Sequence, residues 1–227
     1  MFAKVTADYS KFPAEIRDVL PILEGEVSEL RTYWEVYRFL FMEKEEKTKF
    51  LAERFGAMLG LMQNLLESQM ILSISCLTDK DFKGQRNVSL RALTEAIPAA
   101  KEKDFRAKVN SALDKISSTV ADVRLHRHKH IAHFDLNVAL GQHAMPIIFL
   151  NQFKSALEQM ESFLNLFHWE FERVEVGFDG LSCGDFTEQA FTTACKSKVF
   201  DELEAEGIIR LGELERRIDK WPWWSWH

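Results

Sequence analysis

The stretch from Thr48 to Leu77 constrains the fold most strongly, because its apolar residues keep recurring at three- and four-residue steps. That spacing places them along one side of an α-helix, which turns through about 100° per residue. Leu61, Ile71 and Leu72 widen the apolar surface beyond one stripe. A helix that is apolar on more than one side packs in the centre of a bundle or in a dimer interface. The sequence therefore predicts an all-α protein built around this helix.

The same period predicts the other helices of a bundle. It indicates helices over residues 26–42, 99–130 and 147–174, and a short helix over 90–97 with Ser89 as its N-cap. The chain has 227 residues but only 10 Gly and 5 Pro, too few for the many tight turns of a β-fold. We expect long antiparallel helices in one bundle.

Prolines and glycines indicate where the bundle begins and ends. Pro13 is expected to open a short helix that Pro21 interrupts, so residues 1–25 are assigned to an N-terminal lead-in. Residues 26–176 form the predicted bundle, and three glycines in the next eight residues end it. Residues 185–227 are assigned to a C-terminal helical extension.

The extension is expected to hold two helices and an aromatic tail. The helices are predicted over 185–206 and 211–220, and four of the six tryptophans lie in the tail, 221–227. The tail has almost no basic residues, so we expect it to pack on the protein's own surface or on a partner rather than to stack on RNA bases.

Charge and hydropathy exclude several classes of protein. A net charge of −6 does not fit a protein coated with positive charge, although it permits a local basic pocket. Neither a signal peptide nor an apolar stretch of membrane-spanning length is found, so we expect a cytoplasmic protein that does not contact membranes. The cysteines Cys76, Cys183 and Cys195 are widely spaced and are expected to be reduced thiols.

One basic segment carries most of the chemistry in the sequence. Between Arg124 and His133 lie four of the seven histidines and three Arg or Lys residues, with no acid among them. Arginine binds phosphate through two hydrogen bonds, and histidine can transfer a proton near neutral pH. Cleavage of RNA needs these groups, because a 2′-hydroxyl is deprotonated, the leaving oxygen is protonated and the phosphorane is stabilised by cations.

Two other interpretations of this segment stay open. His126, His130 and His133 would lie on one face of an ideal helix and could bind zinc, although no carboxylate joins them and the neighbouring cations would repel the metal. Basic residues at a helix C-terminus can also serve only to interact with the helix dipole.

Residues 127–133, Arg-His-Lys-His-Ile-Ala-His, resemble the signature of the HEPN (higher eukaryote and prokaryote nucleotide-binding) superfamily. That signature is an arginine, usually a polar residue, and a histidine after four to six intervening positions. The continuation through Phe134 and Asp135, together with the Leu77-Thr78-Asp79 turn, is similar to the AbiU-like abortive-infection branch. Cys76 stands where that branch would have arginine.

The resemblance implies a dimeric helical bundle with endoribonuclease activity that needs neither metal nor cofactor, in toxin–antitoxin or antiviral systems. It implies that Arg127 binds the scissile phosphate, His133 transfers a proton and His128 orients the site. The other basic side chains, Arg124, Lys129 and His130, are assigned to substrate binding. The expected partners are RNA and a second copy of the chain, with an antitoxin or a nucleotidyltransferase as a further partner. The alternative function is a non-catalytic module of the same fold that binds protein or RNA.

Helix geometry also favours a shared site. Residues six apart lie about 240° apart around an ideal helix, so Arg127 and His133 cannot share one face of an unbroken helix. Either the helix ends between them or each works with the counterpart in a second subunit. Asp79 is expected to cap the following backbone, and Asp135 to pair with Arg127 or His133. His143 is expected to be solvated, and His168 to be a core histidine.

Overall fold

The computed structural model describes residues 9–80, 87–99, 101, 103–131, 135–178 and 183–208, and these residues form helices without a β-strand. A 3₁₀ turn, η1 (Tyr9–Lys11), precedes two long helices, α1 (Ala14–Phe41) and α2 (Glu45–Thr78). The short helix α3 (Leu90–Glu95) leads into α4 (Lys103–Thr119) and α5 (Ala121–His126). A π-helical turn, η2 (Arg127–Ile131), and the short α6 (Leu136–Ala139) precede α7 (Leu150–Phe171) and α8 (Cys183–Ala205). The all-α prediction is confirmed.

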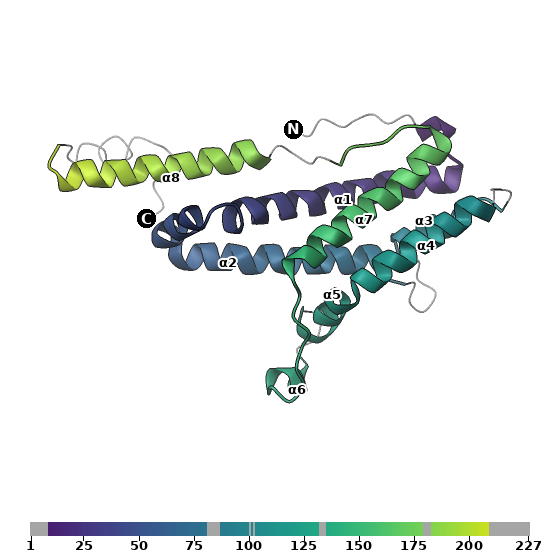
Figure 1. Cartoon of the computed structure of the whole chain (residues 1–227), viewed down its shortest axis with the longest axis horizontal. Helices are drawn as coiled ribbons and strands as arrows, with labels where there is room; N and C mark the ends of the chain where they lie inside the picture. Colours follow the sequence, from purple (N-terminus) through teal and green to yellow (C-terminus); the bar gives the residue numbers. More distant parts are fainter. Residues whose placement is uncertain are drawn as a thin grey trace, which may run out of the picture.

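Helices α1, α2, α4 and α7 form the body of the molecule (Figure 1). Helix α1 packs against α2 on one side and α7 on the other, and α7 in turn packs against α4. The short α3 lies between α1 and α4, while α5 returns to the end of α2. Because α5 and η2 both contact α2, the basic segment is brought next to a part of the chain far from it in sequence.

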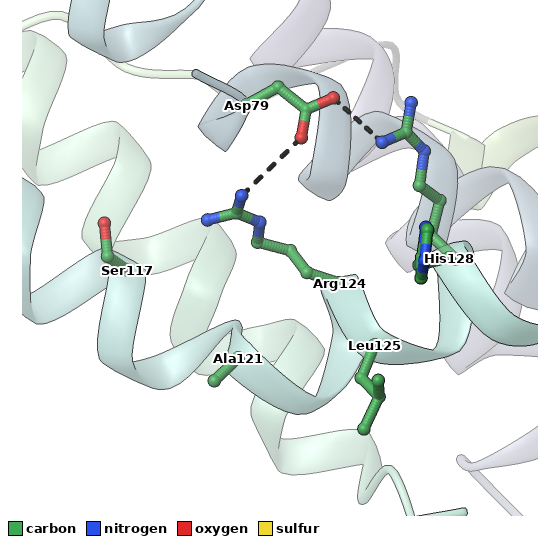
Figure 2. A pocket seen from close by; sticks show the side chains of 7 residues that line it. Asp79, Ser117, Ala121, Arg124, Leu125 and His128 are labelled. Atoms are coloured by element: carbon green, nitrogen blue, oxygen red, sulfur yellow. Dashed lines mark ion pairs between the residues drawn. The ribbon is translucent and has the colours of Figure 1, made fainter.

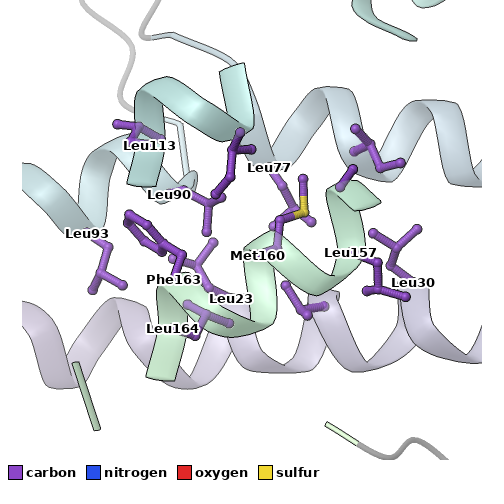
Figure 3. Packing of buried hydrophobic residues seen from close by; sticks show 14 of the residues in the cluster. Leu23, Leu30, Leu77, Leu90, Leu93, Leu113, Leu157, Met160, Phe163 and Leu164 are labelled. Atoms are coloured by element: carbon purple, nitrogen blue, oxygen red, sulfur yellow. The ribbon is translucent and has the colours of Figure 1, made fainter. Parts of the chain in front are cut away.

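The core lies between these helices (Figure 3), and most of the buried side chains that the structure describes are apolar. Phe163 and Phe167 of α7 are its largest fully buried side chains. They pack with leucines of α1 and α3, including Leu23 and Leu90, which are fully buried as well. Burial of each such side chain contributes about 1.5–3 kcal/mol, so this cluster is the main source of stability.

Helix α1 does not break at Pro21, so the expected interruption is wrong. Pro21 lies inside the helix, and Ile16, Leu20 and Leu23 around it are fully buried. An internal proline costs about 3 kcal/mol because a hydrogen bond is lost and its ring crowds the preceding turn. Burial of three large side chains offsets that cost. Ile16, Leu20 and Leu23 therefore belong to the same core cluster as the buried residues further along α1.

The helix predicted over 99–130 is in fact two helices and a π turn. Val120, between α4 and α5, has φ −96° and ψ 9°, outside the α-helical range, and its side chain is fully buried. The chain changes direction there and α5 is directed towards α2. Apolar periodicity did not predict this bend because Ile116, Val120 and Val123 all stay buried across it.

The remaining helix predictions agree with the structure. The Ser89 hydroxyl accepts a hydrogen bond from the Ala92 N–H at 3.4 Å and caps α3. Helix α8 packs on the end of the α1–α2 hairpin, where Phe191 meets Phe50 edge-on and Asp201 pairs with Arg54. The helix predicted over 211–220 and the tryptophan tail lie outside the described residues.

Candidate nucleic-acid site

The end of helix α2 supplies an acid to the basic segment. Leu77 is buried in the core, and the Thr78 hydroxyl donates to the Ile74 carbonyl at 2.8 Å, which fixes the last turn. Asp79 is extended, with φ −66° and ψ 151°, and ends the helix. This turn directs the Asp79 carboxylate towards α5 (Figure 2).

Asp79 forms ion pairs with two arginines of the basic segment. Its Oδ2 lies 3.0 Å from Nη1 of Arg127, and its Oδ1 lies 3.8 Å from Nη2 of Arg124 (Figure 2). The two arginines are three residues apart and therefore lie on neighbouring turns of the helix. One carboxylate thus connects both guanidinium groups.

A hollow of about 460 Å³ opens beside these ion pairs. Its lining comes from the end of α2, from α4 and from the α5–η2 segment: Asp79, Ser117, Ala121, Arg124, Leu125, Arg127 and His128. Three of the residues that the sequence predicted as functional, Arg124, Arg127 and His128, therefore share one site. Two guanidinium groups against a single carboxylate make this a cationic hollow that suits a phosphate, and the His128 imidazole lies in its lining.

Arg127 has unused hydrogen-bonding capacity in this arrangement. Its Nη1 pairs with Asp79, but its buried Nε has no acceptor among the residues that the structure describes. A buried donor without a partner costs about 1–3 kcal/mol. Such groups are rare in native proteins, and a catalytic role or a bound ion is one explanation for them.

The segment after Arg127 is a π-helical turn rather than an α-helix. It ends at Ile131, and the Asp135 N–H donates to the Lys129 carbonyl at 3.1 Å just beyond it. Such turns contain one extra residue and are frequent at functional sites. The α-helix therefore gives way to a π turn at Arg127, and residues 132–134 beyond that turn lie outside the described residues. His133 itself lies outside the described residues.

Lys129 and His130 do not line the hollow. Lys129 pairs with Asp135, its Nζ lying 2.5 Å from Oδ2. The hydrogen bond from Lys129, with those from the backbone of Val138 and Asn137, lowers the pKa of the Asp135 carboxyl below its usual range. Among the described residues, Asp135 thus pairs with Lys129 and not with Arg127, because the π turn brings Lys129 back towards the start of α6.

The other histidines occupy different environments. His126 bonds through its Nε2 to the carbonyl of Pro146. His143 is exposed, as expected. His168 is fully buried between Glu24 and Glu172, which confirms it as a core histidine. Within the described part of the chain, no three His, Cys, Asp or Glu side chains are grouped to hold a metal ion.

Asp79 was expected mainly to cap the backbone, with a role in the dimer or the active site as the weaker alternative, and its two ion pairs place it beside the hollow. The ion pairs join the end of α2 to α5, and no local pattern reports a pairing between helices so far apart in sequence. The Leu77-Thr78-Asp79 turn is part of the family resemblance, and its aspartate is the one feature in the sequence that pointed to these ion pairs.

The described residues form an all-α bundle with a cationic hollow at the end of α2. The family model HEPN_AbiU2, described as AbiU2, matches residues 14–181, well over half of the chain. The chain therefore belongs to the AbiU2 family of HEPN domains. No curated protein and no solved structure matches it.

The match begins at the first residue of α1 and ends just before α8. It thus covers residues on both sides of Pro21 together with the whole of the basic segment. Every helix that the structure describes is too short or too polar to cross a lipid bilayer.

Proposed function

We propose that this protein is a metal-independent endoribonuclease that acts as a toxin or abortive-infection effector, with a composite Arg/His site formed by two copies of the chain. The observation that carries the proposal is the meeting of Arg124, Arg127 and His128 in one cationic hollow. These are groups that bind a phosphodiester and transfer protons during its cleavage. Membership of the AbiU2 family supports the same biological setting.

The proposed reaction is transesterification within the RNA. The 2′-hydroxyl oxygen attacks the adjacent phosphorus, the bond from phosphorus to the 5′-oxygen breaks, and a 2′,3′-cyclic phosphate and a 5′-hydroxyl are formed. Arg127 binds the non-bridging oxygens and stabilises their growing charge. His133 transfers the proton that the 2′-hydroxyl loses or the 5′-oxygen gains, and His128 orients the phosphate.

The surface of α2 supports the participation of a second copy. Met58, Leu61 and Leu65 are large apolar side chains that are 59%, 59% and 55% exposed. Their three- and four-residue spacing puts them on one face of α2, and at about 100° per residue Cys76 and Asp79 continue that face to the hollow. An exposed apolar face of this kind marks a protein interface.

A twofold axis beside this face would bring the two basic segments together. Leu125, in the lining of the hollow, is itself 41% exposed and would be covered in the same contact. Two cationic hollows joined in one cleft would bind RNA even though each chain has a net charge of −6. Homodimers most often form through the same face of both copies.

The proposal is tested by RNA cleavage in the presence of EDTA. Wild-type protein is expected to cleave single-stranded RNA, whereas Arg127→Ala and His133→Ala are expected to lower the rate by at least about 100-fold. Arg38→Ala is the control, because Arg38 is an exposed arginine of α1 that pairs with Glu35 and Glu43. It is expected to cleave as fast as wild type.

Mixing the two inactive variants tests the composite site. If Arg127 of one subunit works with His133 of the other, exchange of subunits restores about a quarter of the wild-type rate, since half of the dimers are mixed and each has one intact site of two. RNA binding without cleavage by wild type would instead favour the non-catalytic module. Loss of activity in chelator, with one zinc per chain, would favour a zinc hydrolase.

A further inference from the structure

We propose that Asp79 is an internal substitute for the substrate phosphate. In the absence of RNA it holds the guanidinium groups of Arg127 and Arg124, and it releases Arg127 when a phosphate of the RNA enters the hollow. This inference rests on the proposed function, because it concerns the same site. It makes Asp79 a positioning residue that also lowers the affinity of the site for anions.

The geometry of the ion pairs is the first support. Asp79 presents one carboxylate oxygen to each arginine, at 3.0 Å from Arg127 and 3.8 Å from Arg124. Two non-bridging oxygens of a phosphate can bridge a pair of guanidinium groups in the same way. The carboxylate therefore lies where the charge of a bound phosphate would be needed.

The second support is that Asp79 satisfies Arg127 incompletely. Only Nη1 of Arg127 is paired with the carboxylate, while the buried Nε has no acceptor among the described residues. A phosphate has more acceptor oxygens than a carboxylate, so a phosphate that bridges the two arginines could also accept a hydrogen bond from Nε, on the edge of the guanidinium group that Nε shares with Nη2. Exchange would then remove the cost of an unsatisfied buried donor.

The third support is that the pairs are accessible and the acid is anchored. The Asp79 side chain is 21% exposed and those of both arginines are 34% exposed, so water screens the ion pairs and little energy opposes their opening. The Asp79 N–H is bonded to the Cys76 carbonyl at 3.3 Å. The backbone at Asp79 is thus fixed while the long arginine side chains can turn towards the hollow.

The two roles of Asp79 have opposite effects on binding and on turnover. Without its charge, the hollow attracts phosphate more strongly, because two guanidinium groups lose their counterion. Without its carboxylate, Arg127 also loses the group that orients it, so the rate of cleavage falls. A merely structural residue would weaken binding or leave it unchanged when it is replaced.

The test compares Asp79→Asn with Asp122→Asn, which makes the same change in charge. Asp122 lies on α5, accepts a hydrogen bond from Gln152 at 3.4 Å and does not line the hollow. The probe is a fluorescein-labelled 2′-O-methyl oligouridine, which cannot undergo cleavage because its 2′-oxygens are blocked. Its affinity is measured by fluorescence anisotropy at low and at physiological salt.

Asp79→Asn is expected to bind this probe roughly three- to tenfold more tightly than wild type at low salt, with a smaller gain at higher salt. Asp122→Asn is expected to stay within about twofold of wild type, since a charge outside the hollow acts through solvent. Asp79→Glu keeps the charge and is expected to bind like wild type. On cleavable RNA, Asp79→Asn is expected to lower both KM and kcat.

The inference is overturned if Asp79→Asn binds no more tightly than Asp122→Asn, or if neither protein binds. Circular dichroism establishes whether each variant is folded, and Asp79→Ser replaces Asp79→Asn if the latter is not. Failure of the proposed function gives a different result: wild-type protein then leaves RNA intact, whatever the order of the affinities.

Discussion

His168 of α7 and Glu24 of α1 are in direct contact inside the bundle, through Nε2 of the imidazole and one carboxylate oxygen. The other ring nitrogen, Nδ1, lies 3.0 Å from Glu172. Burial alone would lower the pKa of His168, but its hydrogen bonds to Glu24 and Glu172 raise the pKa above its usual value. The Tyr9 hydroxyl also donates a hydrogen bond to Glu24. The burial of Tyr9 and this hydrogen bond raise its pKa. This cluster joins the start of α1 to the end of α7.

The cluster predicts that stability falls as pH rises. A folded-state pKa above 6.5 means that protonated His168 stabilises the fold. That contribution is complete below the unfolded-state pKa and is lost as the pH rises through the folded-state pKa. Denaturant unfolding at pH values below and well above 6.5 measures the effect.

His168→Gln should remove most of this pH dependence and lower the free energy of unfolding below pH 6.5 by roughly 3–5 kcal/mol, as when one partner of a buried charged pair is removed. His143→Gln is the control, because His143 is exposed. A pH profile in His168→Gln as steep as that of wild type would show that another group is responsible.

Arg31→Met is expected to lower the free energy of unfolding by about 1.5–3 kcal/mol, the contribution of hydrogen bonds to a charged group. Arg31 of α1 donates twice to Glu161 of α7, at 2.9 Å and 2.6 Å, and both side chains are largely buried. Arg38→Met serves as the comparison, since Arg38 pairs only with exposed or half-buried acids and should cost less than about 1 kcal/mol. Equal losses in the two variants would mean that the link between α1 and α7 adds nothing.

Gly56→Ala and Gly60→Ala are expected to change stability in opposite directions. Gly56 of α2 has φ +40°, which costs an L-amino acid about 1–2 kcal/mol, although a Cβ would meet no atom within 4 Å. Gly60 lies in the same helix with open space and no positive φ, so alanine there should stabilise the helix by up to about 1 kcal/mol. Thermal unfolding of both variants gives the signs, and a stabilising Gly56→Ala would contradict the positive φ at Gly56.

Leu65→Glu is expected to dissociate the proposed dimer, because a carboxylate would be buried in the apolar face of α2. Asn64→Glu adds the same charge at the adjacent exposed position, about 100° around the helix, and should leave the dimer intact. Light scattering over a range of concentrations measures the mass of each. A wild-type monomer, or a Leu65→Glu dimer as tight as wild type, would contradict the assignment of this face.

The period of apolar residues predicted the helices well, because the buried face of a helix is formed by residues that are close together in the sequence. Helices α2, α3, α7 and α8 begin and end within a few residues of their predicted bounds. The period could not detect the bend at Val120, where the buried side continues unchanged, nor the π turn, because one extra residue leaves no mark in composition. Pro21 was misread because the packing of a whole helix outweighs one unfavourable residue.

The candidate site was predicted where its residues are close in sequence. Arg124, Arg127 and His128 lie on consecutive turns, so their concentration is visible in the chain itself. Asp79 is contributed by the end of α2 and reaches them only through the packing of α5 on α2. Its partners depend on tertiary structure, which a search for local motifs does not represent. The grouping of Lys129 with Asp135 depends in the same way on the π turn.

The hollow is built from helices that are far apart in the sequence, so it assembles only late in folding. Synthesis of the chain produces Asp79 well before the arginines, and all three meet only after α5 has folded back onto α2. A nascent or partly unfolded molecule therefore contains the same side chains without the pocket. The capacity to bind a phosphate would appear together with the completed bundle and disappear when the bundle opens, so that proteolysis or unfolding at the junction of α4 and α5 would switch it off.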